Sequence, residues 1–221
     1  MNRAFAIAGA LIGAGWATAA CADPSQLVGA YAFTGTAACL VSPNGFDGSN
    51  RPNDIAGPNG GASFTRSFSV EGIRTFDGAG NGKVKGTAVS VVGRPTNQGV
   101  APNVSSADFS FNFTYVVNAD GSWTSTMVDG SFTEMINTGP RAGQTVTMAP
   151  GFGIAPVTGL ISIDGKTLTA AHLAPAIEKR VFVDTVSPEM CHRSRVLMKI
   201  NDSGDQGQGQ GQGQGQDQNQ P

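Results

Sequence analysis

The sequence predicts an all-β fold, an antiparallel up-and-down barrel of about 8 to 10 strands. Apolar and polar residues alternate with period two along much of the chain between Asp23 and Asn201. Asp-Gly turns separate the alternating stretches, as they do in β-hairpins. Only residues 170–177 could hold a helical turn, and Pro175 limits it. A two-sheet β-sandwich is the alternative, but closure into a barrel removes the exposed strand edges.

The clearest strand runs from Phe109 to Val117. Its large side chains stand at every second position and therefore share one face of the strand. These residues are Phe109, Phe111, Phe113, Tyr115 and Val117. Asp120 and Gly121 form a turn, after which residues 123–128 return as the hairpin partner.

A second hairpin pairs residues 64–76 with residues 83–92. Gly72 lies where the apolar alternation changes phase, which indicates a β-bulge. The turn at residues 77–82 is similar to a calcium-binding EF-hand loop at its first, fifth and sixth positions. Alanines occupy the third and twelfth positions, where ligands belong, so we expect a glycine-rich turn and no metal site.

Further strands are expected before, between and after these hairpins. They cover residues 27–34, 130–136, 144–148, 157–163, 167–171, 179–183 and 193–200. Two longer connections, residues 41–62 and 137–156, are rich in Gly and Pro. Loops of this length are often functional, so we expect them to border the barrel mouth and its pocket.

Residues 1–22 have the order of a secretory signal peptide. Arg3 precedes an apolar run that ends in small residues, and Ala20, Cys21 and Ala22 form a cleavage site before Asp23. The run of about 17 apolar residues is short for a membrane span of about 20. Cleavage before Cys21, followed by its lipidation, is the alternative. We therefore expect a secreted or periplasmic protein, or one that is lipid-anchored through Cys21.

The mature chain divides into one barrel domain, residues 23–201, and a tail, residues 202–221. The tail alternates Gln with Gly and is expected to be disordered, because it has no apolar side chains to bury.

Cys39 and Cys191 are the remaining cysteines of the domain, and an oxidising compartment favours a disulfide between them. Closing a loop of about 150 residues would contribute about 4 to 5 kcal/mol. A metal pair or a catalytic thiol lacks suitably spaced partners.

Residues 27–35 resemble the opening strand of calycin-type barrels, the lipocalin-like group, which commonly begin with Leu-x-Gly-x-Trp. Tyr31 stands where those proteins have Trp. Residues 72–82 are similar to a hairpin of uncharacterised exported bacterial proteins of this shape. The later Thr-Asp-Tyr turn of the calycin group is not identified here. The resemblance implies a barrel and transfers no site residue.

Composition excludes some functions. Charged residues make up 14% of the chain, with 14 Lys and Arg against 16 Asp and Glu, so no strong field exists to attract nucleic acid. No serine-hydrolase elbow, paired-carboxylate motif or cofactor motif occurs.

Of the two histidines, His172 is expected to be structural. His192 belongs to a basic cluster with Lys179, Arg180, Arg193 and Arg195, interpreted as a solvated strand edge or a contact for an anionic ligand.

The leading hypothesis is a non-enzymatic exported barrel that binds a small apolar ligand, or a surface partner, at its loop-bearing mouth. The expected ligand-binding residues are Phe109, Phe111, Phe113, Tyr115, Arg66 and Arg74. Neither a metal nor another cofactor is expected, and no transmembrane span is expected in the mature chain. The oligomeric state has no sequence signal.

Two other hypotheses are open. An isomerase or cyclase acting on a lipid-like substrate would need a polar group from His172, Glu134, Arg66 or Arg74 to point into the barrel. A structural, envelope-associated protein would use the Gln-Gly tail and the outer surface. An integral outer-membrane barrel is disfavoured, because aromatic residues are only 7% of the chain and show no girdle pattern.

Overall fold

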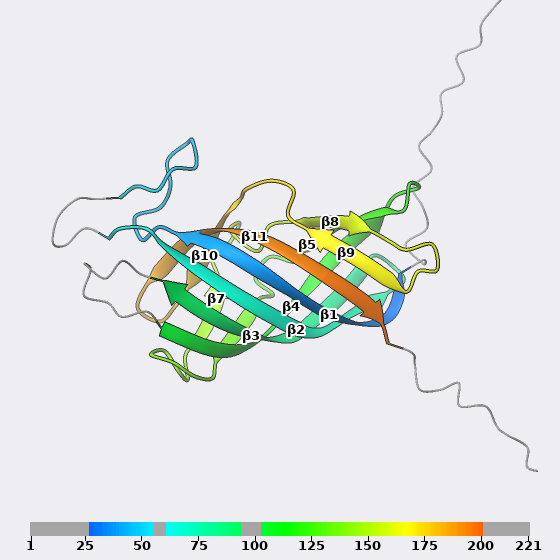
Figure 1. The fold of residues 1–221 in the computed structure, drawn as a ribbon, viewed down its shortest axis with the longest axis horizontal. Helices are drawn as coiled ribbons and strands as arrows, with labels where there is room; N and C mark the ends of the chain where they lie inside the picture. Colours follow the sequence, from blue (N-terminus) through cyan, green and yellow to red (C-terminus); the bar gives the residue numbers. More distant parts are fainter. Residues whose placement is uncertain (1–26, 55–60, 94–102, 201–221) are drawn as a thin grey trace, which may run out of the picture.

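The computed structural model describes residues 27–54, 61–93 and 103–200. The predicted signal peptide, Cys21 and the predicted tail lie outside these residues. The described part of the chain is built from antiparallel strands and contains no helix (Figure 1). The strands are β1 (Val28–Val41), β2 (Phe64–Asp77), β3 (Asn81–Gly93), β4 (Asn103–Val117), β5 (Ser122–Met127), β6 (Thr133–Ile136), β7 (Thr145–Met148), β8 (Val157–Leu160), β9 (Thr167–Ala171), β10 (Ile177–Val181) and β11 (Val186–Lys199).

The predicted all-β fold is confirmed, and the sheet closes into a barrel rather than a sandwich. A ring of 8 strands runs in the order β1-β2-β3-β4-β5-β8-β9-β11, and β11 pairs with β1. The described chain has 11 strands, more than expected. Residues 170–177 hold the end of β9 and the start of β10, with no helical turn between them.

The extra strands arise because the barrel wall divides. β4 pairs with β6 over residues 107–110 and with β5 over residues 113–117. β11 likewise pairs with β10 over residues 186–190 and with β9 over residues 194–198. Two sets of three short strands, β5-β8-β9 and β6-β7-β10, therefore complete the wall side by side between the same two long strands. The simple meander expected from sequence lacks this division.

The seam of the barrel is the pairing of β1 with β11, which runs from Tyr31 to Val41. Sequence alternation predicted shorter strands here, because the residues after Thr34 are small and show little contrast. Cys39 and Cys191 are direct cross-strand partners in this seam and form a disulfide, with an S–S distance of 2.05 Å and a Cα–Cα distance of 4.0 Å. The predicted pairing is confirmed, and the bond lies in the seam of the barrel.

The β-bulge predicted at Gly72 is wrong. The pairing of β2 with β1 and with β3 passes through Gly72 without interruption. The apparent change of phase came from Ile73, which faces outward and is 45% exposed, while its neighbour Arg74 faces inward and is buried. A buried arginine next to an exposed isoleucine imitates a one-residue slip in the apolar pattern.

Glycine at positions 72 and 86 permits a close approach of two strands. Gly72 and Gly86 are cross-strand partners. An added Cβ would lie 2.2 Å from the carbonyl oxygen of Lys85 at the first position and 2.3 Å from that of Glu71 at the second. Side chains cannot fit there, and the rings of Phe33 and Phe109 lie against Gly86 on the inner side of the wall.

One end of the barrel is filled by aromatic side chains. Phe76 makes edge-on contacts with Tyr31, Phe113, Tyr115 and Trp123, at centroid distances of 5.1–5.8 Å. The polar atoms of the two tyrosines and the tryptophan donate hydrogen bonds to backbone carbonyls. We call these five residues the aromatic cluster. They close the end of the barrel opposite the loop that follows β1.

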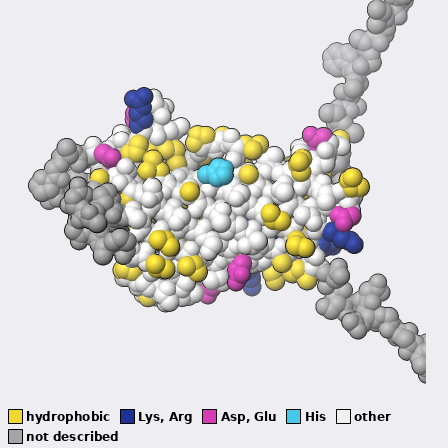
Figure 2. Space-filling model, in the orientation of Figure 1, with side chains coloured by type: hydrophobic (Ala, Val, Ile, Leu, Met, Phe, Trp, Pro, Cys, Tyr) yellow, Lys and Arg dark blue, Asp and Glu magenta, His cyan; other side chains and the backbone are white. Residues whose placement is uncertain are grey.

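The face of the barrel shown in Figure 2 has few charges. On the face shown in Figure 2, hydrophobic side chains are scattered singly or in small groups among uncharged ones, and acidic and basic side chains are sparse. Within the described residues no helix is long and apolar enough to cross a membrane. The distinctive charges of this protein lie inside the barrel.

Candidate functional site

The barrel contains a cavity of about 110 Å³. Most of its wall is apolar, built from inward-facing side chains of the long strands and of both three-strand sets, and from the connections that follow β5 and β7. These side chains are Phe33, Phe68, Val70, Val84, Ala88, Phe109, Phe111, Met127, Phe132, Met148, Ile154, Ala155, Val157, Ala170 and Leu197. The rings of Phe33 and Phe109, which line the cavity, also lie against Gly86, where a side chain would collide with them.

Eight charged side chains share this cavity. They are Arg66, Arg74, Arg180, Arg193, Arg195, Glu134, Glu178 and Glu189. Five positive charges less three negative ones leave the cavity with a charge of +2 when all are ionised, whereas the whole chain carries −2. Buried charges are costly unless they are paired, so the partners of each group decide what the site can do.

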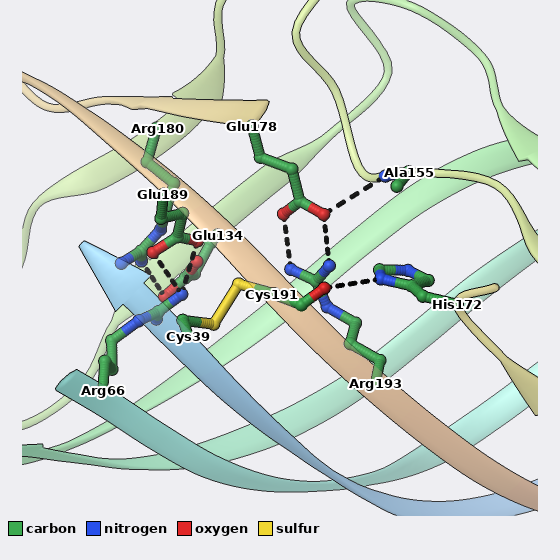
Figure 3. Close-up of polar contacts among 10 residues, drawn as sticks. All are labelled: Cys39, Arg66, Glu134, Ala155, His172, Glu178, Arg180, Glu189, Cys191 and Arg193. Carbon is green, nitrogen blue, oxygen red and sulfur yellow. Dashed lines mark hydrogen bonds and ion pairs between the residues drawn. A yellow bond between two sulfur atoms is a disulfide. The ribbon is translucent and has the colours of Figure 1, made fainter. Parts of the chain in front are cut away.

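Two ion pairs lie close together (Figure 3). Arg66 donates through Nη2 to both carboxylate oxygens of Glu189, at 2.6 and 2.9 Å. Arg180 donates through Nη2 to Oε1 of Glu134, at 2.6 Å. Burial lowers the pKa of Arg66 even though Glu189 opposes that shift. Its Nε is buried and has no hydrogen-bond partner in the described structure.

A third pair joins Arg193 to Glu178 in a two-pronged contact (Figure 3). Arg193 Nη2 donates to Oε2 at 2.5 Å, and Nη1 donates to Oε1. The backbone N–H of Ala155 donates to the same Oε1 at 3.2 Å, so the loop between β7 and β8 is tied to the pair. Burial disfavours the charge of Arg193, but Glu178 outweighs it and raises the pKa of the guanidinium.

Arg74 differs from these three arginines, because it has no carboxylate partner among the described residues. Its Nη2 donates to Oγ of Ser125 at 3.2 Å. Its guanidinium carbon lies 4.2 Å from the ring centroid of Phe113 and 5.3 Å from that of Trp123. Burial, and secondarily the charge of Arg195, lower the pKa of Arg74 to about 9. Arg74 thus joins the aromatic cluster to the cavity as an uncompensated cation.

Arg195 is the second arginine of the cavity without a carboxylate in the described structure. Its Nη1 donates to the backbone carbonyls of Thr36 and Ser194, each at 2.8 Å. The side chain lies across Gly35, where an added Cβ would come within 2.5 Å of its Cδ. Burial, followed by the charge of Arg193, lowers the pKa of Arg195 to about 10.

His172 has a structural place beside the seam. On the edge of β11 away from β1, no strand of the described chain pairs with residues 191–193, between the pairings with β10 and β9. There His172 Nδ1 lies 2.8 Å from the carbonyl oxygen of Cys191 (Figure 3). A carbonyl can only accept, so the proton is on Nδ1. Burial, together with Arg193, lowers the pKa of His172 and keeps the ring neutral. Nε2 is buried without a hydrogen-bond partner in the described structure, and the ring does not line the cavity.

One group of potential metal ligands occurs in the described ranges: Cys39, Glu189 and Cys191. The two sulfur atoms are bonded to each other, and Glu189 is engaged by Arg66. At the turn expected to lack a metal, Asp77 accepts hydrogen bonds from the backbone N–H groups of Asn81 and Ala79, which lower its pKa. This carboxylate therefore organises the turn.

The structure divides the six side chains expected to bind a ligand. Phe109, Phe111, Arg66 and Arg74 line the cavity. Phe113 and Tyr115 instead pack in the aromatic cluster, from the same face of the same strand. Strand parity places all of the aromatic side chains of β4 inside but carries no information on how far along the barrel the cavity extends.

The solvated interpretation of the basic cluster is wrong for its central members. Arg180 and Arg193 are buried in ion pairs, and Arg195 lines the cavity. Lys179 points the other way and lies 3.5 Å from the ring centroid of Phe152. Arg193 has the same parity as Cys191, which was a usable signal for an inward direction.

The predicted loop 137–156 also contains β7, so it forms two connections.

No protein-family model and no curated protein sequence matches the chain. The interpretation of the site therefore depends on its own residues and their geometry.

Proposed function

We propose that this protein binds a small, largely apolar molecule inside its barrel. The observation that supports this is the cavity of about 110 Å³ with a mainly apolar wall. Pockets for larger ligands typically measure about 300–1,000 Å³. An engineered apolar cavity of about 150 Å³ admits benzene. A ligand with one aromatic ring or a short alkyl chain therefore suits this cavity better than a long lipid.

A binding role agrees with the state of the cavity carboxylates. A catalytic base needs a free lone pair directed at the substrate. The three glutamates that line the described cavity are each bound by an arginine, and His172 lies outside the lining. Glu134, Arg66 and Arg74 line the cavity, as the isomerase or cyclase hypothesis requires, so that hypothesis stays the second candidate. Binding is favoured over it because each glutamate is already engaged by an arginine. The structural and surface-partner hypotheses have no specific observation in their favour.

Ligand binding can be tested by filling the cavity. Ala88 faces inward and lines the cavity, whereas its neighbour Val89 faces outward and is 45% exposed. We expect Ala88→Leu to abolish ligand co-purification in native mass spectrometry of the exported protein, while Val89→Leu retains it. Equal ligand occupancy in Ala88→Leu and wild-type protein would place the binding site outside this cavity. The absence of any bound small molecule in the wild-type protein after supplementation with aromatic and short-chain compounds would contradict the binding function.

We also propose that the protein is exported, and is a lipocalin-like barrel of the secreted or periplasmic space. The disulfide and the signal-like order of residues 1–22 support export. Mass spectrometry of the mature N-terminus tests it: cleavage before Asp23 is expected. A lipid-modified Cys21 would instead support the anchored alternative, and an intact Met1 in the mature protein would contradict both.

A further inference from the structure

Two of the five cavity arginines have no carboxylate to balance them. Glu189, Glu178 and Glu134 are each committed to one arginine, and Arg74 and Arg195 remain. Each of these two guanidiniums makes hydrogen bonds to neutral oxygen atoms. An uncompensated charge is disfavoured in a site of low dielectric constant. A cavity with this charge balance selects for a negative ligand.

Arg74 is placed to receive such a group. It is 92% buried, since only 8% of it is exposed, and it lines the cavity. The ring of Phe113 lies against the guanidinium at 4.2 Å from its carbon. Of the five N–H donors of an arginine, one donation is made, to Ser125. The other guanidinium nitrogens of Arg74 are not among the buried atoms without partners in the described structure, so they keep some accessible surface in a residue that lines the cavity.

Ser125 adds a second donor at the same place. Its side chain is buried and lines the cavity beside Arg74. Because its Oγ accepts the hydrogen bond from Arg74, its own hydroxyl proton is free to be donated. A guanidinium and a hydroxyl that lie side by side can each donate a hydrogen bond to the same carboxylate, which has two oxygens to accept them.

The apolar wall defines the other end of the ligand. Val84, Phe111 and Leu197 line the same cavity as Arg74 and Arg195. They favour a hydrocarbon body over a small inorganic anion, which would leave this surface uncovered. The size of the cavity limits that body to about one aromatic ring.

We infer that the ligand is a small monocarboxylic acid, whose carboxylate accepts hydrogen bonds from Arg74 and Ser125 in the positive field of Arg195 while its hydrocarbon part contacts the apolar wall. This inference rests on the proposed binding function and specifies the chemical class of the ligand. It also explains why the barrel retains an arginine next to its aromatic cluster.

A matched pair of probes tests the inference on the exported, disulfide-bonded protein. Benzoate and benzyl alcohol have the same ring and nearly the same size, but only benzoate carries a charge. Isothermal titration calorimetry at pH 7 should give a dissociation constant for benzoate about 10-fold to 100-fold lower than for benzyl alcohol, because hydrogen bonds to charged groups are the strong ones. Inorganic phosphate, an anion without a hydrocarbon body, should bind more weakly than benzoate.

Variants assign the preference to its residues. Arg74→Met should remove the preference for benzoate and retain binding of benzyl alcohol, and Ser125→Ala should reduce the preference several-fold. Arg51→Met is the matched control, because Arg51 is exposed and lies outside the cavity lining. Near-ultraviolet circular dichroism of each variant checks that the barrel is folded. If Arg74→Met does not fold, Arg74→Lys, which keeps the charge without the planar fork, should show an intermediate preference.

The outcomes separate the inference from the function on which it rests. Equal affinity of the wild-type protein for benzoate and benzyl alcohol would overturn the carboxylate assignment and leave apolar binding intact. A benzoate preference that persists in Arg74→Met would overturn the role of Arg74. Stronger binding of phosphate than of benzoate would contradict a monocarboxylate ligand. Failure of benzoate, benzyl alcohol, hexanoate and hexan-1-ol to bind the wild-type protein at all would contradict both proposals.

Discussion

Glu178 and Glu189 are direct cross-strand partners on β10 and β11, both face the barrel interior, and each is bound by a different arginine. Two like charges in this position repel each other, and each needs its own cation in a buried site. The pairs Arg193–Glu178 and Arg66–Glu189 are therefore interdependent, and both stand next to the disulfide of the seam (Figure 3).

Removing one member of the Arg193–Glu178 pair should lower the free energy of unfolding much more than removing both members. Glu178→Leu leaves Arg193 buried with no carboxylate of its own, and we expect the free energy of unfolding to fall by about 3–5 kcal/mol. The double variant Glu178→Leu/Arg193→Met should recover most of this loss, as measured by urea denaturation. Asp184→Ala is the control: it breaks the exposed Arg141–Asp184 pair and should cost less than about 1 kcal/mol. A double variant as unstable as the single one would contradict this account.

Arg74→Met should stabilise the protein while it removes the proposed carboxylate site. Burial lowers the pKa of Arg74 to about 9, so its charged form is disfavoured in the folded state and costs stability at every pH below 9. We expect the variant to have a free energy of unfolding about 1 kcal/mol higher at pH 7.

The sign of the pH dependence follows from the same shift. Between pH 9 and the ordinary pKa of 12.5, the unfolded chain holds the Arg74 proton and the folded one releases it, so this residue adds stability as the pH rises. The advantage of Arg74→Met over wild type should therefore be smaller at pH 10 than at pH 7. Urea titrations of both proteins at the two pH values measure this difference in the free energy of unfolding. A difference that grows with pH would contradict the lowered pKa of Arg74.

Replacing both seam cysteines should destabilise the barrel strongly. Cys39→Ala/Cys191→Ala removes a cross-link between residues 152 apart in sequence, which corresponds to about 4–5 kcal/mol in the chain-entropy model. Reduction of the wild-type protein should lower its melting temperature to a similar value. Dithiothreitol should have no effect on the double variant, and a shift there would point to a cause other than this bond.

Gly86→Ala should cost about 2 kcal/mol or more, because its Cβ would meet the backbone carbonyl of Glu71 at 2.3 Å and no side chain can move aside. Gly48→Ala is the matched control, since nothing lies within 4 Å of its added Cβ. Thermal melts of the two variants compare them. Equal melting temperatures would show that the strands separate at little cost.

The positions of most strands were predictable, because period-two alternation survives in β2 to β5 wherever the inward residues are apolar. The alternation is misleading where inward residues are charged. Arg74 produced the false indication of a bulge at Gly72. The basic cluster with Arg193 was interpreted as a solvated edge or an anion contact, because the shared parity of Arg193 and Arg195 does not by itself say which face is buried; the parity with Cys191 does.

The candidate site was only half predictable for a related reason. Phe109 and Phe111 stand out in sequence, and their place in the cavity follows from parity. The pairing of Arg180 with Glu134 joins residues 46 positions apart through the divided wall, and no local pattern encodes that division. It depends on β4 and β11 each holding two partners along one edge.

The seam bond also changes the connectivity of the molecule. With Cys39 joined to Cys191, the chain between them becomes a covalent ring that contains the whole of β2 to β10. A single proteolytic cut in a loop such as residues 42–54 opens that ring but releases no strand. After such a cut the two peptides would stay joined through the disulfide and would separate only after its reduction.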